Sequence, residues 1–463
     1  MRTHIHTFLR FIFAIKPLLW VISGAILIRI VFFIVVTQSQ PQGLGNEVND
    51  GMHYLKLAQS ILNHQSYAIQ YPNGEIKDFF RPPAYPLFIA FTLFLDKSLQ
   101  FLIYLQILLS AGTVFFIAQT AKYIFKSKNY LLPAVLYAVE PNNIAYCTYI
   151  SSETLFVFLW IFALFLFFKA WQEKKAVFLY ISASLFVFSL YTRPIAQYGL
   201  YLTSFFMLYA MFKRIFTLKQ GVIYILIILI LPCVWSFRNY VHTKHFVFTA
   251  QKGWQTLFFY CASVEQHITG QGFEETQIQF FNRYPTEYIK KHHIAVTDTT
   301  NLLVLTNAIT FEDDRYFQEE AKKYLMAHKA DFARSFIKGT TYMLFGVGNW
   351  TWETYLGNLQ KRGLKQVFDE PSLIQKLKSQ FVRDTVQQTL FRILHFIFLL
   401  MVYTLFLRNV YVFRRNVYMY FLILLMLYMM ILVAIVMENR YRIPIIAMMS
   451  ILGFYDANLK SKR

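Results

Sequence analysis

Five arginines stand at the ends of apolar segments, whereas the cations at most other segment ends are lysines. These arginines are Arg81, Arg193, Arg238, Arg440 and Arg442. A guanidinium group presents a fork of N–H donors that matches two phosphate oxygens, while an ammonium group acts as a point charge. The use of arginine therefore favours a phosphate-binding site. Alternatively, the side chains only extend to lipid headgroups or pair with nearby carboxylates. Those carboxylates are Glu140, Glu153, Glu438 and Asp456.

Asp50 precedes a short segment with the periodicity of an amphipathic helix. Tyr54, Leu57 and Ala58 in this segment fall on one helical face. The simplest interpretation of Asp50 is that it caps this helix, because a carboxylate accepts the unpaired N–H groups of a helix N-terminus and is favoured by the helix dipole. The composition of the segment predicts that the helix lies at a membrane surface.

Arg81 is followed directly by Pro82 and Pro83. A proline restricts the preceding residue to extended conformations, so Pro82 should hold Arg81 extended. Pro83 can occupy the first turn of a helix, where its missing N–H has no cost. We therefore expect an apolar helix over roughly 83–95, with Arg81 held stiffly at its start.

The composition shows which kind of protein must position these side chains. The 463 residues are 56% hydrophobic, 19% aromatic and only 15% charged, whereas soluble domains carry about 25% charged residues. Apolar runs of the length needed to cross a bilayer predict an all-α polytopic membrane protein with about ten spans. The expected spans are 17–36, 98–118, 130–147, 153–170, 176–192, 195–212, 220–237, 387–407, 416–437 and 444–458.

The net charge is +20, and the positions of the cations along the chain agree with the predicted topology. With both termini in the cytoplasm, each inner connection carries about three cations and the short outer connections carry few, as the positive-inside rule expects. The charge therefore does not indicate nucleic-acid binding. The first span is read as an uncleaved anchor. Residues 1–237 form an N-terminal membrane module with a long outer loop at 37–97, residues 238–386 form a large outer region, and residues 387–463 return to the membrane.

Several blocks of the sequence resemble bacterial family 39 glycosyltransferases of the GT-C superfamily, which are relatives of protein O-mannosyltransferases and of the lipid A aminoarabinose transferase. The first outer loop carries Asp50, Tyr54, Ala58 and then Arg81-Pro82-Pro83-x-Tyr85-Pro86. The other blocks are Ser152-Glu153, Trp235-Ser236-Phe237-Arg238-Asn239-Tyr240 and Glu438-Asn439-Arg440-Tyr441-Arg442-Ile443-Pro444. Region 255–386 matches little.

This resemblance implies a GT-C-like bundle of about 10 (9–13) membrane helices, with interfacial helices in the first outer loop and a mostly helical outer domain. It also implies inverting transfer of a sugar from a polyprenyl-phosphate donor to a lipid, glycan or protein acceptor, at the extracytoplasmic face of the bacterial inner membrane. Members of the family use an acidic residue of the first outer loop at the active centre. The matching residue is Asp50, which would act as the general base, and Glu47 is the fallback.

The remaining expected site residues divide between the phosphate and the sugar. Developing charge on a leaving phosphate requires fixed cations in a site poor in water, for which the candidates are Arg81, Arg193, Arg440 and Arg442. Residues expected around the substrate are Tyr54, Tyr85, Glu153 and Arg238. Glu153 would orient an arginine or a sugar hydroxyl, although a simple ion pair with Arg193 fits equally well.

Other functions receive less support. A secondary transporter would place its charges near the membrane midplane and often shows two related halves, and no repeat is visible. An O-antigen ligase or polymerase also uses a lipid-linked donor, but the first-loop pattern fits it less well. No HExxH or Cys/His cluster is present, so no obligatory metal is expected, although a divalent cation is possible.

Overall fold

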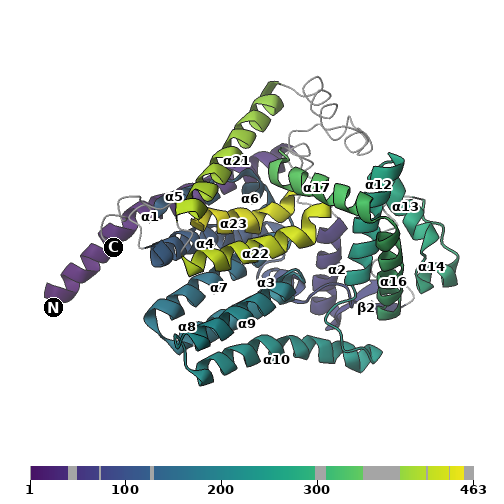
Figure 1. Cartoon of the computed structure of the whole chain (residues 1–463), viewed down its shortest axis with the longest axis horizontal. Coiled ribbons are helices and arrows are strands. Elements are labelled where there is room, and N and C mark those ends of the chain that lie inside the picture. Colours follow the sequence, from purple (N-terminus) through teal and green to yellow (C-terminus); the bar gives the residue numbers. More distant parts are fainter. Residues whose placement is uncertain are drawn as a thin grey trace.

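The computed structural model describes residues 2–39, 49–71, 74–125, 130–297, 309–347, 386–412, 416–436 and 438–452. Within these residues the chain is mainly helical, and only one small antiparallel hairpin is added (Figure 1). The fold class predicted from composition, a helical polytopic membrane protein, is thereby confirmed.

Six described helices are long and apolar enough to cross a bilayer. Their apolar stretches are Pro17–Val35, Leu99–Ile124, Glu153–Glu173, Leu218–Thr243, Val386–Val412 and Val417–Val436, the last including the 3-10 turn Ala434–Val436. The parent helices are α1 (Arg2–Ser39), α4 (Leu99–Phe125), α7 (Glu153–Glu173), α10 (Leu218–Thr243), α21 (Val386–Val412) and α22 (Val417–Val433). The shorter helices packed among them include α8 (Ala176–Thr192), α9 (Ala196–Phe212) and α23 (Arg442–Leu452). Each of the six apolar stretches overlaps a span predicted from the sequence.

The predicted span 130–147 is wrong as a single helix. The structure divides it into α5 (Leu131–Ala138) and α6 (Pro141–Tyr146). Pro141 occupies the first turn of α6, and Glu140 before it is extended, with its side chain accepting a hydrogen bond from the Asn143 N–H at 2.5 Å. A residue before proline is disfavoured in the helical conformation, so the chain must break here.

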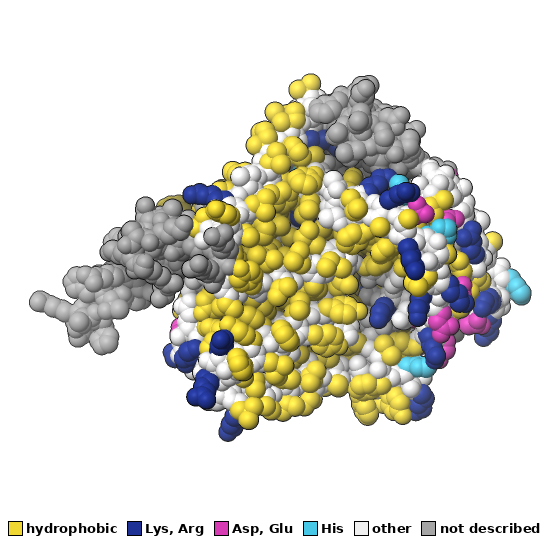
Figure 2. All heavy atoms as spheres, in the orientation of Figure 1, with side chains coloured by type: hydrophobic (Ala, Val, Ile, Leu, Met, Phe, Trp, Pro, Cys, Tyr) yellow, Lys and Arg dark blue, Asp and Glu magenta, His cyan; other side chains and the backbone are white. Residues whose placement is uncertain are grey.

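The aromatic residues of the membrane helices form much of their shared core. Phe206 of α9 stacks on Phe421 of α22 with ring centroids 4.2 Å apart, and Phe167 of α7 lies 5.4 Å from the same Phe421 ring. Offset and tilted ring pairs of this kind add to the stabilisation that burial alone provides. Figure 2 shows the outcome on one face: apolar side chains cover the membrane helices, with Lys and Arg at one end and a mixture of acidic and basic side chains at the other.

A compact helical unit lies at the mixed-charge end, beside the first outer loop (Figure 1). Its elements are α11 (Lys252–Gln255), the π-helical turn Thr256–Cys261, α12 (Ala262–Thr269), α13 (Phe273–Arg283), α14 (Glu287–His292) and α16 (Phe311–Ala327). Its core includes Trp254, Phe258 and Phe281. Phe80 of the first outer loop packs into this core, and the Ala250 N–H donates to the Phe79 carbonyl at 2.9 Å. The first loop is therefore anchored on its outer side.

The next helix, α17 (Lys329–Phe345), crosses the connection between α22 and α23. Gly339 makes this close approach possible, because a Cβ atom there would lie 2.2 Å from the Ala434 carbonyl oxygen. This part of the outer region is thus a 17-residue helix that packs against the 3-10 turn Ala434–Val436.

Candidate functional site

The first outer loop consists of α2 (Asn49–His64), a hairpin of β1 (Ala68–Tyr71) and β2 (Gly74–Lys77), and α3 (Ala84–Leu95). Both helices confirm sequence predictions, and α3 begins directly after the two prolines. In the hairpin, Ala68 lies opposite Lys77. This arrangement brings the start of α2 to the start of α3, so that Asp50 and Arg81 meet.

The Asp50 carboxylate is held by two guanidinium groups from opposite ends of the chain. Arg81 Nη2 donates to Asp50 Oδ1 at 2.5 Å, and Arg440 Nη1 donates to Asp50 Oδ2 at 3.0 Å. The Asp50 side chain keeps 34% of its surface exposed, whereas Arg81 and Arg440 keep 10% and 17%. The carboxylate therefore faces an opening while its two cations are mostly enclosed.

Two further carboxylates extend this charged cluster. Glu153, at the start of α7, pairs with Arg193, which follows α8, and its Oε1 lies 3.8 Å from Arg440 Nε. Glu438 also pairs with Arg440. The formal charges of the six residues cancel: Asp50, Glu153 and Glu438 contribute −3, and Arg81, Arg193 and Arg440 contribute +3. The guanidinium groups that could bind an anion are thus already engaged by carboxylates.

The pKa values of Asp50 and Glu438 are shifted in opposite directions. Burial raises the pKa of Asp50, but the charges of Arg81 and Arg440 outweigh it and hold that pKa well below its usual range. Burial also raises the pKa of Glu438, and the neighbouring Asp50 and Glu153 add to this against the attraction of Arg440. Glu438 is therefore the carboxyl of this pair that takes up a proton more readily.

Arg81 is fixed by contacts on several sides. Its guanidinium carbon lies 4.9 Å from the centroid of the Tyr54 ring and 5.0 Å from that of Phe80, within the range of cation–π attraction. Its Nε donates to His53 Nδ1 at 3.2 Å. The backbone N–H of Arg81 donates to Asp78 Oδ1 at 2.7 Å. Tertiary contacts therefore hold Arg81 in place, in addition to the restriction that Pro82 puts on its backbone.

His53 and Asp78 were missed as site residues by the sequence reasoning. His53 Nε2 and Asp78 Oδ2 are 2.5 Å apart, and both side chains are fully buried. A local signal existed for Asp78, because an aspartate that accepts N–H bonds two and three residues further on is a common turn former. No local signal joins His53 to Asp78, which lies 25 residues away.

The two predicted tyrosines lie beneath the charged cluster. The Tyr54 hydroxyl donates to Ser152 Oγ at 3.3 Å, and its ring meets Tyr85 edge-on at 4.9 Å. The Tyr85 hydroxyl donates to Gln106 Oε1 at 2.7 Å, and the Tyr85 side chain is fully buried. Tyr85 therefore supports the floor of the site, and Tyr54 lies between this floor and Arg81.

Arg238 lies behind the first loop. Its Nη1 donates to the Asp78 carbonyl at 2.8 Å, and its Nη2 donates to the Tyr67 carbonyl at 3.2 Å. Its guanidinium group is also 4.9 Å from the ring centroids of Phe79 and Trp235. These contacts tie the loop that carries Arg81 to the end of α10.

Arg442 is not brought to the Asp50 cluster in the described part of the chain. Its Nη1 donates to the carbonyls of Met343, Leu344 and Gly346 at 2.9–3.0 Å, and its Nη2 is 3.4 Å from His395 Nε2. Arg442 therefore binds the C-terminal turn of α17, where a helix presents unpaired carbonyl groups. Its expected role in donor phosphate binding stays a prediction.

Two other predictions concern Glu47 and metal ions. Glu47 lies outside the described residues. Among the described residues, no group of three or more His, Cys, Asp or Glu side chains is arranged to hold a metal ion. Asp314, half of an adjacent acidic pair, accepts the N–H groups of Gly253 and Trp254, so it organises the outer helical unit.

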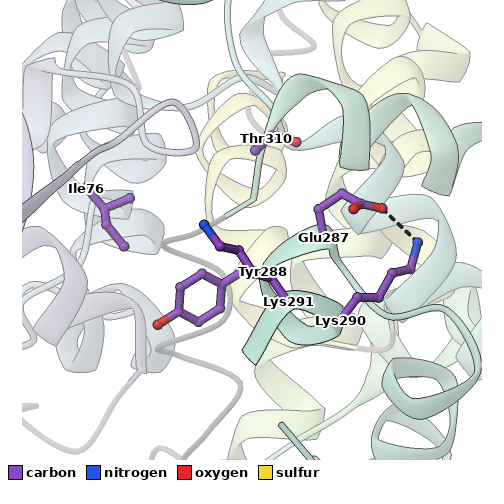
Figure 3. Close-up of a pocket in the computed structure, with 6 residues that line it drawn as sticks. All are labelled: Ile76, Glu287, Tyr288, Lys290, Lys291 and Thr310. Carbon is purple, nitrogen blue, oxygen red and sulfur yellow. Dashed lines mark hydrogen bonds and ion pairs between the residues drawn. The ribbon is translucent and has the colours of Figure 1, made fainter. Parts of the chain in front are cut away.

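A shallow hollow lies outside the Asp50 cluster, between the hairpin and the outer helical unit (Figure 3). It is lined by Ile76, Glu287, Tyr288, Lys290, Lys291 and Thr310. Lys290 is drawn back to Glu287 by an ion pair of 2.8 Å. Both members of that pair are at least half exposed, so the hollow is an open surface feature.

Comparison with known proteins gives one family match. The model of the family described as dolichyl-phosphate-mannose-protein mannosyltransferase matches residues 80–237, about a third of the chain. The matched segment begins beside Arg81 and ends beside Arg238. This match agrees with the resemblance found in the sequence, and it supports a membrane glycosyltransferase.

Among solved structures, the chain is similar to ArnT from Cupriavidus metallidurans bound to undecaprenyl phosphate. The alignment covers 92% of this chain and 76% of the ArnT chain, with 12% identity and a TM-score of 0.38. That score is too low to establish a common arrangement of helices. No curated protein matches.

Proposed function

We propose that this protein is a membrane glycosyltransferase that moves a sugar from a polyprenyl-phosphate donor to an acceptor at the extracytoplasmic face, with inversion at the anomeric carbon. The observation that carries this proposal is the Asp50 carboxylate, held between Arg81 and Arg440 and open on one side. The family match over residues 80–237 supports the same reaction class.

Asp50 is proposed as the general base. An acceptor hydroxyl attacks the anomeric carbon from the face opposite the phosphate, its proton passes to Asp50, and the bond between that carbon and the phosphate oxygen breaks. A single displacement of this kind inverts the configuration. The negative charge of Asp50 also favours the oxocarbenium-like transition state of glycosyl transfer.

Arg81 and Arg440 are proposed to bind the donor phosphate, and Arg193 is a further candidate beside them. Because both oxygens of Asp50 are paired with guanidinium groups in the unliganded cluster, Asp50 is a weak base in that state. The donor phosphate, a phosphodiester with one negative charge, competes for the same forks. Its binding would loosen Asp50 from the arginines, increase the basicity of the carboxylate, and place the cations where charge develops on the leaving group.

The acceptor is proposed to approach from the side of the outer helical unit within the predicted region 238–386, which packs against the first loop through Phe80. A lipid, a glycan or a protein with a free hydroxyl fits this chemistry. The proposed setting is the bacterial inner membrane with both termini cytoplasmic. The chemistry needs no obligatory cofactor, and a divalent cation remains compatible with it.

The test is transfer by the purified protein, supplied with a panel of undecaprenyl-phosphate sugars and a membrane extract as acceptor source. We expect consumption of one donor by the wild-type protein and its loss in Asp50→Asn, with donor binding retained because Arg81 and Arg440 remain. Asp96→Asn is the matched control, since Asp96 is an exposed carboxylate after α3. Wild-type rates in Asp50→Asn would remove Asp50 from the mechanism, and consumption of no donor would reject this donor class.

A further inference from the structure

We infer that His53 and Asp78 are positioning residues that aim the Arg81 guanidinium group at the donor phosphate. This inference rests on the proposed function, because it names how one of its phosphate-binding residues is oriented. Neither residue touches the proposed substrate. They act through one continuous chain of hydrogen bonds: Asp78 to His53, His53 to Arg81, and Arg81 to Asp50.

The geometry of this chain determines which groups donate. Asp78 Oδ1 accepts the backbone N–H groups of Phe80 and Arg81 at 3.1 and 2.7 Å, and Asp78 Oδ2 lies 2.5 Å from His53 Nε2. An ionised carboxylate only accepts, so His53 Nε2 carries a proton and donates it. Nδ1 of the neutral ring is then left as an acceptor, and it faces Arg81 Nε–H at 3.2 Å.

The alternative forms of His53 would break this chain. A ring protonated at Nδ1 alone would point a donor at the Arg81 donor. A cationic ring would do the same and would add a positive charge beside the guanidinium group. Burial lowers the pKa of His53, and Arg81 lowers it further against the pull of Asp78, which agrees with a neutral ring at neutral pH. Asp78 therefore selects the tautomer that Arg81 requires.

Fixing Nε fixes the plane of the whole guanidinium group. The Tyr54 and Phe80 rings bound that group at about 5 Å, but ring contacts allow rotation within the slot. The bond from Nε to His53 removes this freedom, so that Nη2 meets Asp50. A pre-oriented fork loses less entropy when it binds phosphate, and this gain should appear as affinity.

Two substitutions interrupt the chain without emptying the space. His53→Gln can still donate an amide N–H to Asp78, but it offers no acceptor at the position of Nδ1. Asp78→Asn keeps a carbonyl oxygen for the turn, while its amide N–H₂ group facing Nε2 would favour the opposite His53 tautomer. Both should therefore misorient Arg81 and leave the loop folded.

The experiment is a double-mutant cycle read out as undecaprenyl-phosphate affinity in lipid nanodiscs. We expect His53→Gln and Asp78→Asn each to weaken binding about tenfold, the scale of one hydrogen bond to a charged group. In combination with Arg81→Lys, which lacks the Nε–H donor, each should add less than about a twofold change. Such non-additivity identifies residues that act through a common partner.

Ser60→Ala is the matched control, because Ser60 is buried on the same helix and its described side-chain bond is with Gln70. It should bind like the wild type. Thermal unfolding of every variant separates folding defects from binding defects, and Asp78→Asn carries the test if His53→Gln does not fold. Wild-type affinity in both single variants, or full additivity with Arg81→Lys, would overturn the inference alone. Failure of the wild-type protein to bind undecaprenyl phosphate would instead overturn the proposed donor, and this inference with it.

Discussion

Asp50 and Glu438 are two carboxyl groups that share Arg440, yet their pKa values are shifted in opposite directions. Asp50 receives a guanidinium group on each oxygen. Glu438 shares its one described arginine with Asp50 and Glu153. At the scale of single residues, the balance between burial and guanidinium partners therefore lowers the pKa of Asp50 and raises that of Glu438.

Infrared difference spectroscopy can test this division. The depressed pKa of Asp50 means that its carboxylate stays ionised throughout the pH range in which an aspartate ordinarily titrates, and accepts a proton only below that range. The raised pKa of Glu438 means that its proton is retained above the ordinary glutamate range. In the unliganded protein, we expect a protonated-carboxyl band above about pH 4.5 that disappears in Glu438→Gln. In Asp50→Asn the band should move to lower pH, because the charge of Asp50 helps to raise the pKa of Glu438 and its loss leaves Arg440 to Glu438 and Glu153. A band that remains unchanged in Glu438→Gln would contradict this assignment.

Two arginines of one short segment serve different elements. Arg440 projects to the charged cluster at the start of α2, while Arg442 binds the final carbonyls of α17. A helix C-terminus carries partial negative charge, which a buried cation satisfies. At the scale of elements, Arg442 therefore connects the end of α17 to the start of α23.

We expect Arg442→Gln to destabilise the fold by about 3 kcal/mol, the upper end of the range for a hydrogen bond to a charged group. The carbonyl groups of Met343, Leu344 and Gly346 at the end of α17 would lose their shared donor, and a shorter amide cannot reach all three. Thermal unfolding in detergent, followed by tryptophan fluorescence, measures this loss. Arg408→Gln is the control, because Arg408 is exposed on α21. An equal transition temperature in Arg442→Gln and the wild type would show that these bonds contribute little.

The whole molecule has an apolar middle with two polar ends of different character (Figure 2). One end carries mainly Lys and Arg, and the other carries the mixed charges of the outer helical unit. This asymmetry agrees with the positive-inside rule if the basic end is cytoplasmic. The orientation itself stays a prediction, and it places the Asp50 cluster outside.

Cysteine labelling of intact cells tests the orientation. After Cys233, the exposed cysteine among the three, is replaced by serine, a cysteine is introduced at the exposed hairpin residue Glu75 or at the exposed Lys213 after α9. We expect an impermeant maleimide to label Glu75→Cys and to label Lys213→Cys only after the cells are broken. The reverse pattern would invert the topology and move the site to the cytoplasm.

The sequence alone predicted much of the secondary structure, and it identified Asp50 and Arg81 of the first outer loop as candidate site residues. Apolar length predicted the six longest membrane helices, because a spanning helix must bury its backbone polar groups within itself. Local turn chemistry predicted the start of α3 after Pro83. The missed break at Glu140 has the same local origin, since the proline after it was visible in the sequence.

Only the tertiary structure decided which arginines meet Asp50. Arg440 lies 390 residues from Asp50 in the chain and reaches it, while Arg442, two residues further on, turns to α17. His53 and Asp78 likewise pair across a hairpin that the sequence did not reveal. Hydropathy and turn preference act over a few neighbouring residues, whereas an ion pair or a tautomer depends on which distant groups the packed helices bring within about 3 Å of each other.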